Sequence, residues 1–184
     1  MHELLQTEPD VEVIWRAFEL RPEPVPKLDP NGDYLQRAWN TSVYPLAERL
    51  GVRMRLPPLQ PRTRLAHEAA HWARSQGRFD AYHEEIFRAF FERGEDIGAP
   101  DVLVTLAAEL GLKTNALHQV LKTHDFEKSV LNDESAAARF GVTGVPAFIA
   151  NRRATLSGVR PVEHLKQLVD QVDTAHQTAK LRRT

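Results

Sequence analysis

Two short stretches of the sequence carry residues whose types and spacing could do chemistry. The first is HEAAH at residues 67–71, which matches the H-E-x-x-H pattern. In that pattern two histidines one helical turn apart bind zinc, and the glutamate activates a zinc-bound water. His67 and His71 would share one face of a helix, with Glu68 between them in sequence, so the spacing permits a zinc hydrolase.

A catalytic zinc also needs a third protein ligand and an open coordination position. The longer pattern that supplies a third histidine fails here, because WARSQGRF follows His71. His83 and Glu84, on the next predicted helix, are the remaining candidate ligands. The competing interpretation is an amphipathic helix with partly exposed histidines, which we favour because five-residue matches arise by chance. The sequence therefore predicts neither a metal nor another cofactor.

The second stretch is FGVTGVPAFI at residues 140–149, in which a Val-Pro step leads into an apolar run. Its GVTG segment is not a phosphate loop, since it lacks both the Lys-Ser/Thr ending and a following helix. The serines lack the G-x-S-x-G setting that exposes a nucleophile, so no serine hydrolase is indicated. The serines considered are Ser42, Ser75, Ser129, Ser135 and Ser157.

The composition of the 184-residue chain bounds its partners and its chemistry. Lysine and arginine total 24 against 25 aspartates and glutamates, giving a formal net charge of -1, so neither nucleic acid nor an anionic membrane is favoured. The longest apolar runs, DVLVTLAA and GVPAFIA, are far shorter than the roughly 20 residues that span a bilayer. The start, MHELLQTEPDVEV, has no secretory signal pattern, so we expect a cytoplasmic protein.

The chain contains no cysteine. This excludes disulfides, thiolate–metal sites and thiol nucleophiles together. It is the strongest single constraint that the composition supplies.

The elements that must position these residues follow from the apolar periodicity. Residues 11–20, VEVIWRAFEL, alternate in the way that predicts a strand, and four prolines between residues 22 and 30 then predict a loop. A helical stretch at 33–51 should break near Tyr44, because Pro45 follows. Helical patterns fill residues 62–140, and strands at 147–150 and 154–158 with a polar NRR turn precede a final helix from Pro161. The length fits one domain with a single core.

Two further groups of residues have simple structural interpretations. Arg152 and Arg153 fall in the predicted hairpin turn, where a solvated tip is expected. Trp15, Trp39 and Trp72 have no basic stripe beside them, so we expect them to line the core or a groove rather than to stack on nucleic-acid bases.

Taken together, RTRLAHEAAHWARSQGRFDAYHEEIFRAFFERGEDIG, LAAELGL and AAARFGVTGVPAFIANRRATLSGVRPVEHLKQLV resemble the DsbA family of thioredoxin-fold oxidoreductases, in particular its FrnE-like branch. The resemblance runs from about residue 11 to residue 172. It implies an α/β thioredoxin-like core, residues 1–61 and 141–184, that accepts an all-helical insertion at residues 62–140. The family activity is thiol–disulfide oxidoreduction.

The resemblance also implies roles for the Val-Pro step. Pro146 would follow a cis peptide bond, and Thr143, Gly144, Val145 and Pro146 would face a protein or peptide substrate that pairs with the backbone as an added strand. Family members begin with a strand leading into a Cys-x-x-Cys at the start of the first helix, and this sequence has neither before HELLQTEPDVEV. On this resemblance, therefore, the first strand and most of the active-site helix are missing, and no residue is assigned as catalytic.

Three explanations of the missing motif stay open. The natural protein could be longer and carry the Cys-x-x-Cys upstream, or it could be a degenerate homologue that acts as a peptide-binding or chaperone-like module. Other uses of the fold form the third. Because loss of a central strand would leave unpaired strand edges, we expect a rearranged sheet or a homo-oligomer that completes it.

Overall fold

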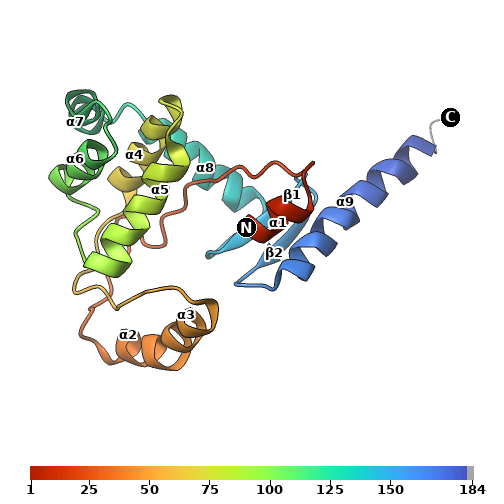
Figure 1. Ribbon diagram of the computed structural model, residues 1–184, viewed down its shortest axis with the longest axis horizontal. Helices are drawn as coiled ribbons and strands as arrows, with labels where there is room; N and C mark the ends of the chain where they lie inside the picture. Colours follow the sequence, from red (N-terminus) through yellow and green to blue (C-terminus); the bar gives the residue numbers. More distant parts are fainter. Residues whose placement is uncertain (182–184) are drawn as a thin grey trace. The chain divides into compact units, whose positions relative to one another are not determined.

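The computed structural model describes residues 1–181, with side chains described for residue 1 and residues 3–172. Its elements, labelled in Figure 1, are α1 (His2–Thr7), α2 (Asp33–Ala38), η1 (Trp39–Val43), α3 (Tyr44–Leu50), α4 (Arg64–Ser75), α5 (Phe79–Arg88), η2 (Ala89–Arg93), α6 (Pro100–Glu109), α7 (Thr114–Thr123), α8 (Glu127–Arg139), β1 (Ala147–Ala150), β2 (Ala154–Ser157) and α9 (Val162–Leu181). Contacts divide the chain into two compact units, Met1–Leu20 with Asp133–Thr184, and Arg21–Asn132.

The larger unit is built on the apolar stripes of α4, α5, α6 and α7, as the periodicity of residues 62–124 predicts. Its core includes the fully buried side chains of Tyr82, Leu103, Leu106 and Leu117. Each such leucine contributes roughly 1.5–3 kcal/mol through removal from water. The Tyr82 hydroxyl donates a 2.7 Å hydrogen bond to the Leu103 carbonyl, and burial raises the pKa of this phenol.

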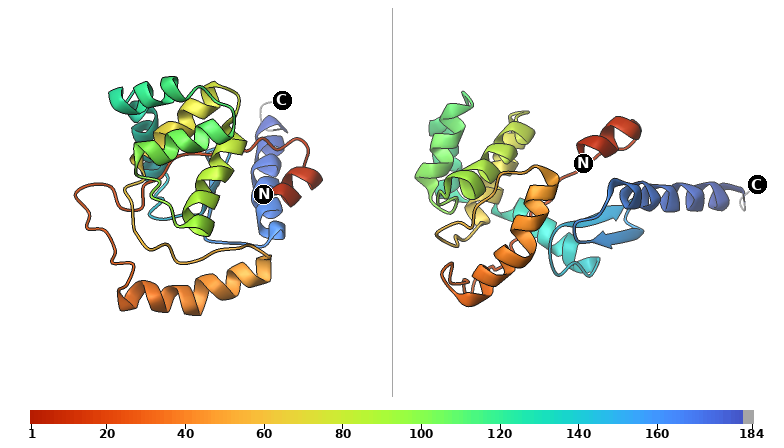
Figure 2. Two further views of the ribbon diagram at one scale, coloured as in Figure 1. Left: turned by 60° about the vertical axis from the view of Figure 1, so that its left-hand side comes forward. Right: turned by 60° about the horizontal axis from the view of Figure 1, so that its bottom comes forward.

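The same unit contains α2, η1 and α3, which Figure 2 shows as one continuous helical rod. Pro45 lies in the first turn of α3, and the preceding turn is π-helical. Proline has no N–H to donate and its ring crowds the preceding turn, so the regular ladder cannot run through this point. The predicted break near Tyr44 is thus a change of helix type. Trp39 is buried against Tyr44 and Phe91, with ring centroids 5.4 and 6.1 Å apart.

The smaller unit contains the only strand pair among the described residues. β1 and β2 form an antiparallel hairpin in which Phe148 lies opposite Leu156 and Ile149 opposite Thr155. Helix α9 packs on both strands, and α1 packs on α9 (Figures 1 and 2). The hairpin and the final helix occur where the sequence predicts them.

The predicted strand at residues 11–20 is wrong, because the structure assigns no strand to this segment. A strand requires a ladder partner, and the backbone here bonds to side chains of α8 instead. The buried carboxylate of Asp133 accepts hydrogen bonds from Arg16 Nη1 at 2.8 Å and from the Ala17 N–H at 3.0 Å. The alternating pattern therefore indicates a segment that is compatible with a strand but forms none here. Asp133 of α8 binds this segment at Arg16 and Ala17.

The boundaries predicted from the sequence separate residues 62–140 from the rest by type of secondary structure. The contacts between residues group residues 21–61 with α4 to α7 in the larger unit, and the ring contact of Trp39 with Phe91 is one of the links. The two units divide between residues 132 and 133, which lie within α8. No helix within residues 1–181 combines the length and the apolar character needed to cross a membrane.

Candidate functional site

The loop at residues 143–146 is held between two regular elements of the smaller unit. On its amino-terminal side, the Val142 N–H donates a 3.0 Å hydrogen bond to the Ala137 carbonyl and so closes the end of α8. On its carboxyl-terminal side, the Pro146 carbonyl accepts a 2.8 Å hydrogen bond from the Gly158 N–H, which extends the hairpin ladder by one pair. The ends of the loop are therefore fixed by a helix and a sheet.

The residues between these anchors present backbone and apolar surface to solvent. Within the described chain, Thr143, Gly144 and Val145 make no backbone–backbone hydrogen bond. Val145 is 50% exposed as a residue, and a Cβ added at Gly144 would meet no atom within 4 Å. The peptide bond between Val145 and Pro146 is cis. Unpaired amide and carbonyl groups beside an exposed apolar side chain are what an extended peptide uses when it adds to a sheet edge.

The side chains of this loop limit its chemistry. They are a hydroxyl, a hydrogen atom, an isopropyl group and a pyrrolidine ring, and none of them titrates near neutral pH. The loop can therefore bind and orient a chain, but it supplies no acid, base or thiolate.

The HEAAH stretch forms part of α4, and its glutamate is buried in the helical core. Glu68 is 0% exposed, and its Oε1 lies 3.0 Å from Nδ1 of His124. Its Oε2 is also buried and has no hydrogen-bond partner among the described residues. A glutamate that activates a zinc-bound water must face an open position, whereas this one is enclosed.

The two candidate third ligands do not join a metal site. His83 stacks on Phe79 at 4.9 Å between centroids and meets Phe87 edge-on at 4.7 Å. Burial, with smaller effects of His67 and Arg74, lowers the pKa of His83 to about 4. Glu84 is exposed and forms an ion pair with Arg88. Across the part of the chain that the structure describes, no three His, Asp or Glu side chains are arranged to hold a metal ion.

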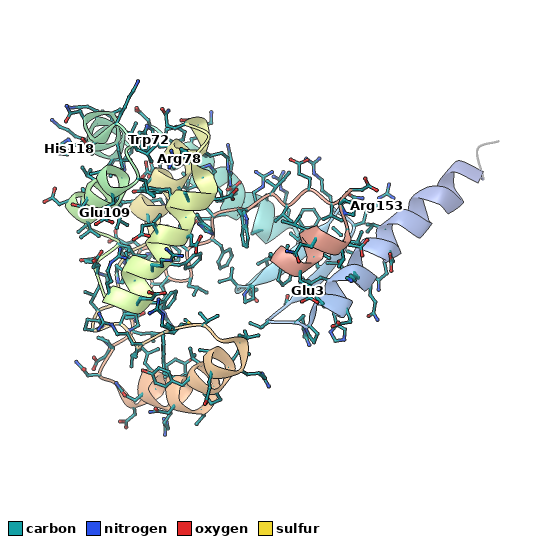
Figure 3. The ribbon with its side chains drawn as sticks, in the orientation of Figure 1. Glu3, Trp72, Arg78, Glu109, His118 and Arg153 are labelled. Atoms are coloured by element: carbon teal, nitrogen blue, oxygen red, sulfur yellow. The ribbon has the colours of Figure 1, made fainter. Side chains whose placement is uncertain are left out.

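The tryptophans and the two arginines considered in the sequence analysis lie in the core, at the surface or in the hairpin turn. Trp39 and Trp72 are buried core residues, as expected, but Trp15 is 40% exposed (Figure 3 labels Trp72). Arg152 and Arg153 lie in the exposed hairpin turn, as expected, where Arg152 has φ 58°.

Sequence reasoning missed His124, which pairs with the buried Glu68. This histidine caps the carboxyl end of α7 in a left-handed conformation, with φ 54°. Its position just past a predicted helix was visible in the sequence, but no motif links it to a glutamate 56 residues away. The hydrogen bond to Glu68 raises the pKa of His124.

The sequence of most of the chain is similar to that of known proteins. The model of the DSBA-like thioredoxin domain family matches residues 1–170. The chain is 40% identical to "Uncharacterized protein YwbO" of Bacillus subtilis (strain 168) over 146 residues, which cover 76% of this chain and 72% of that protein.

Two solved structures are similar over most of their length. One is the probable DsbA oxidoreductase SCO1869 from Streptomyces coelicolor, with a TM-score of 0.73 and 27% identity over 92% of this chain and 80% of that chain. The other is 2-hydroxychromene-2-carboxylate isomerase, with a TM-score of 0.75 and 16% identity over 98% and 89%. The second likeness concerns the fold alone.

Proposed function

Because this chain belongs to the DSBA-like thioredoxin domain family, we propose that it serves thiol–disulfide oxidoreduction as the substrate-orienting part and exchanges no disulfide with its own residues. Its fold is the DsbA-like thioredoxin fold, with a large helical part and a small antiparallel sheet. The similarity to a probable DsbA oxidoreductase supports this class of function, and the absence of cysteine from the sequence removes the thiol step.

The observation that carries the proposal is the open loop of Thr143, Gly144, Val145 and Pro146. It combines unpaired backbone groups with a half-exposed valine, and α8 and the hairpin hold it in place. In our proposal an extended protein segment pairs with this backbone, while an apolar side chain of the segment packs on Val145. We also propose the FrnE-like branch, on the strength of the AAARFGVTGVPAFIANRR stretch.

The binding half of the proposal is tested by Val145→Asp. A carboxylate at this position would repel apolar substrate side chains and would need to be desolvated on binding, so affinity for a fluorescent, cysteine-free extended peptide should fall by about tenfold or more in anisotropy titrations. Val159→Asp is the matched control, since Val159 is 55% exposed and lies outside the loop. Equal affinity of both variants and the parent would contradict the assignment of the loop.

The thiol half of the proposal is tested by insulin reduction with dithiothreitol. The purified chain should leave the rate of insulin precipitation at its buffer value, because no thiolate is present to form a mixed disulfide. Acceleration proportional to the concentration of this chain would show that the chemistry has been misassigned.

A further inference from the structure

The loop at residues 143–146 lies in a stretch of the chain whose charged residues are all arginine. Residues 135–162 contain no aspartate, glutamate or lysine, and their charged residues are Arg139, Arg152, Arg153 and Arg160. All of these arginines are exposed. The whole chain has a formal net charge of -1, so this positive charge is local. The fold decides which of the arginines lie beside the loop.

Arg160 is held beside the carboxyl-terminal anchor of the loop. That anchor is the 2.8 Å hydrogen bond from the Gly158 N–H to the Pro146 carbonyl. Nε of Arg160 donates a 2.9 Å hydrogen bond to the carbonyl of Ser157, the residue before Gly158. The same Nε lies 4.0 Å from the position that a Cβ on Gly158 would take. The guanidinium group of Arg160 is therefore fixed next to the residue that binds Pro146.

Arg139 belongs to the amino-terminal anchor of the loop. It lies in the last turn of α8 and is exposed. Gly141 has φ 67°, and the Val142 N–H bonds to the Ala137 carbonyl, so the chain folds back on this turn just before Thr143. The backbone that begins the loop is thus adjacent to the turn that carries Arg139. A cation here also complements the negative end of the helix, so its part in binding has a test of its own below.

Arg139 and Arg160 form no ion pair with any side chain that the structure describes, whereas Arg88 and Arg93 of the larger unit are paired with glutamates. Within the same described residues, the Nη1 and Nη2 atoms of Arg160 also make no hydrogen bond. A guanidinium group presents N–H donors in a planar fork that matches the two oxygens of a carboxylate. Each end of the loop therefore offers a cation that a bound carboxylate can pair with, without displacing a described ion-pair partner.

We propose that the loop selects extended protein segments in which carboxylates flank an apolar residue. The apolar side chain packs on Val145, and Arg139 and Arg160 bind the carboxylates on either side of it. A protein segment fits this surface better than a nucleic acid does, because unpaired backbone and a valine lie between the arginines, whereas single-stranded bases stack on aromatic rings. This inference rests on the proposed function and adds the class of substrate to it.

The preference is tested with cysteine-free peptides that share one dye and one apolar centre and are flanked by glutamate, by glutamine or by lysine. In anisotropy titrations of the full chain at low salt, the glutamate-flanked peptide should bind about fivefold more tightly than the glutamine-flanked one, since exposed ion pairs are individually weak. The lysine-flanked peptide should bind most weakly. The preference should disappear at about 1 M salt, where the screening length is about 3 Å. Equal affinities of the three peptides at low salt would overturn the proposal.

Substitutions assign the preference to the two arginines. Arg139→Gln and Arg160→Gln should each lower the preference for glutamate about twofold. Arg160→Lys keeps the charge but loses the Nε bond to Ser157, so a retained preference in this variant separates charge from local structure. Arg153→Gln is the matched control, because Arg153 lies in the turn at the opposite end of the hairpin from Pro146 (Figure 3). An equal loss in Arg153→Gln would mean that only general positive charge matters, and the proposal would be wrong.

Val145→Asp separates this inference from the proposed function. If this variant weakens binding of the neutral, glutamine-flanked peptide while glutamate adds no affinity in the parent, the loop binds peptides and only the acidic preference is wrong. If the variant binds the neutral peptide as the parent does, the proposed function is wrong and this inference is overturned with it. Circular dichroism of the helices checks that each variant folds.

Discussion

Glu68 shows how burial decides the role of a residue that a motif had marked for catalysis. The spacing of HEAAH correctly places the residues on one helix, and His67 and His71 are half-buried, as an amphipathic helix predicts. The burial of Glu68 depends on how the turn between α7 and α8 packs against α4. This is a tertiary contact, and it produces no recognisable pattern in the sequence around Glu68. His124 supplies that contact from the left-handed end of α7.

The Glu68–His124 pair predicts a pH dependence of stability. His124 is half-exposed and faces Glu68 and Arg64 from α4 and Glu127 from α8, and the hydrogen bond to Glu68 raises its pKa above 6.5. A raised histidine pKa stabilises the folded state fully below 6.5, and this contribution is lost as the pH rises through the folded-state pKa.

His124→Asn tests this dependence, since asparagine tolerates the left-handed backbone and does not titrate. Below pH 6.5 the variant should be less stable than the parent by about 1 kcal/mol, because a neutral amide donor replaces the charged imidazolium donor at a half-exposed position. The difference should shrink at higher pH in urea unfolding. His118→Asn, on the exposed surface of α7 (Figure 3), is the control. Parallel curves of parent and His124→Asn across the pH range would exclude the effect.

The helices were the most predictable elements, and the strands the least. Local signals suffice for a helix, because its hydrogen bonds lie within one segment: Pro100 begins α6, and Gly111 follows its end with φ 68°. A strand needs a partner from elsewhere in the chain, and the local pattern of residues 11–20 could not reveal that no strand forms there in the part of the chain that the structure describes. The hairpin was predictable because its two strands are neighbours in sequence.

The glycines that end helices provide a test at this level. Gly94 has φ 72°, and a Cβ there would lie 2.9 Å from Cδ of Pro58; Gly111 has a similar φ of 68° and no neighbour within 4 Å. Gly111→Ala should therefore cost only the left-handed penalty of about 1–2 kcal/mol. Gly94→Ala should cost more, because Pro58 must also move.

Helical circular dichroism during urea unfolding measures both losses in the same unit of the chain. Equal losses of unfolding free energy in the two variants would mean that Pro58 moves away from the added Cβ at no energetic cost.

For the protein as a whole, fold and chemistry were predictable to different degrees. The helical block, the hairpin and the loop between them appear in the order that the sequence predicts, and the family match covers residues 1–170. The chemical activity depends on particular side-chain atoms rather than on the fold. The family activity uses a cysteine thiol, and this chain contains no cysteine. The loop at residues 143–146 is therefore the part of the molecule on which our functional proposal depends.

An NMR titration of the isotopically labelled chain with a cysteine-free extended peptide tests that dependence at atomic level. We predict that the largest amide shift changes cluster at Thr143, Gly144 and Val145 and continue into Ala147 at the start of β1, because these groups would receive the backbone hydrogen bonds of the added strand. Shift changes confined to the helical unit, Arg21–Asn132, or the absence of any saturable change, would contradict the proposal.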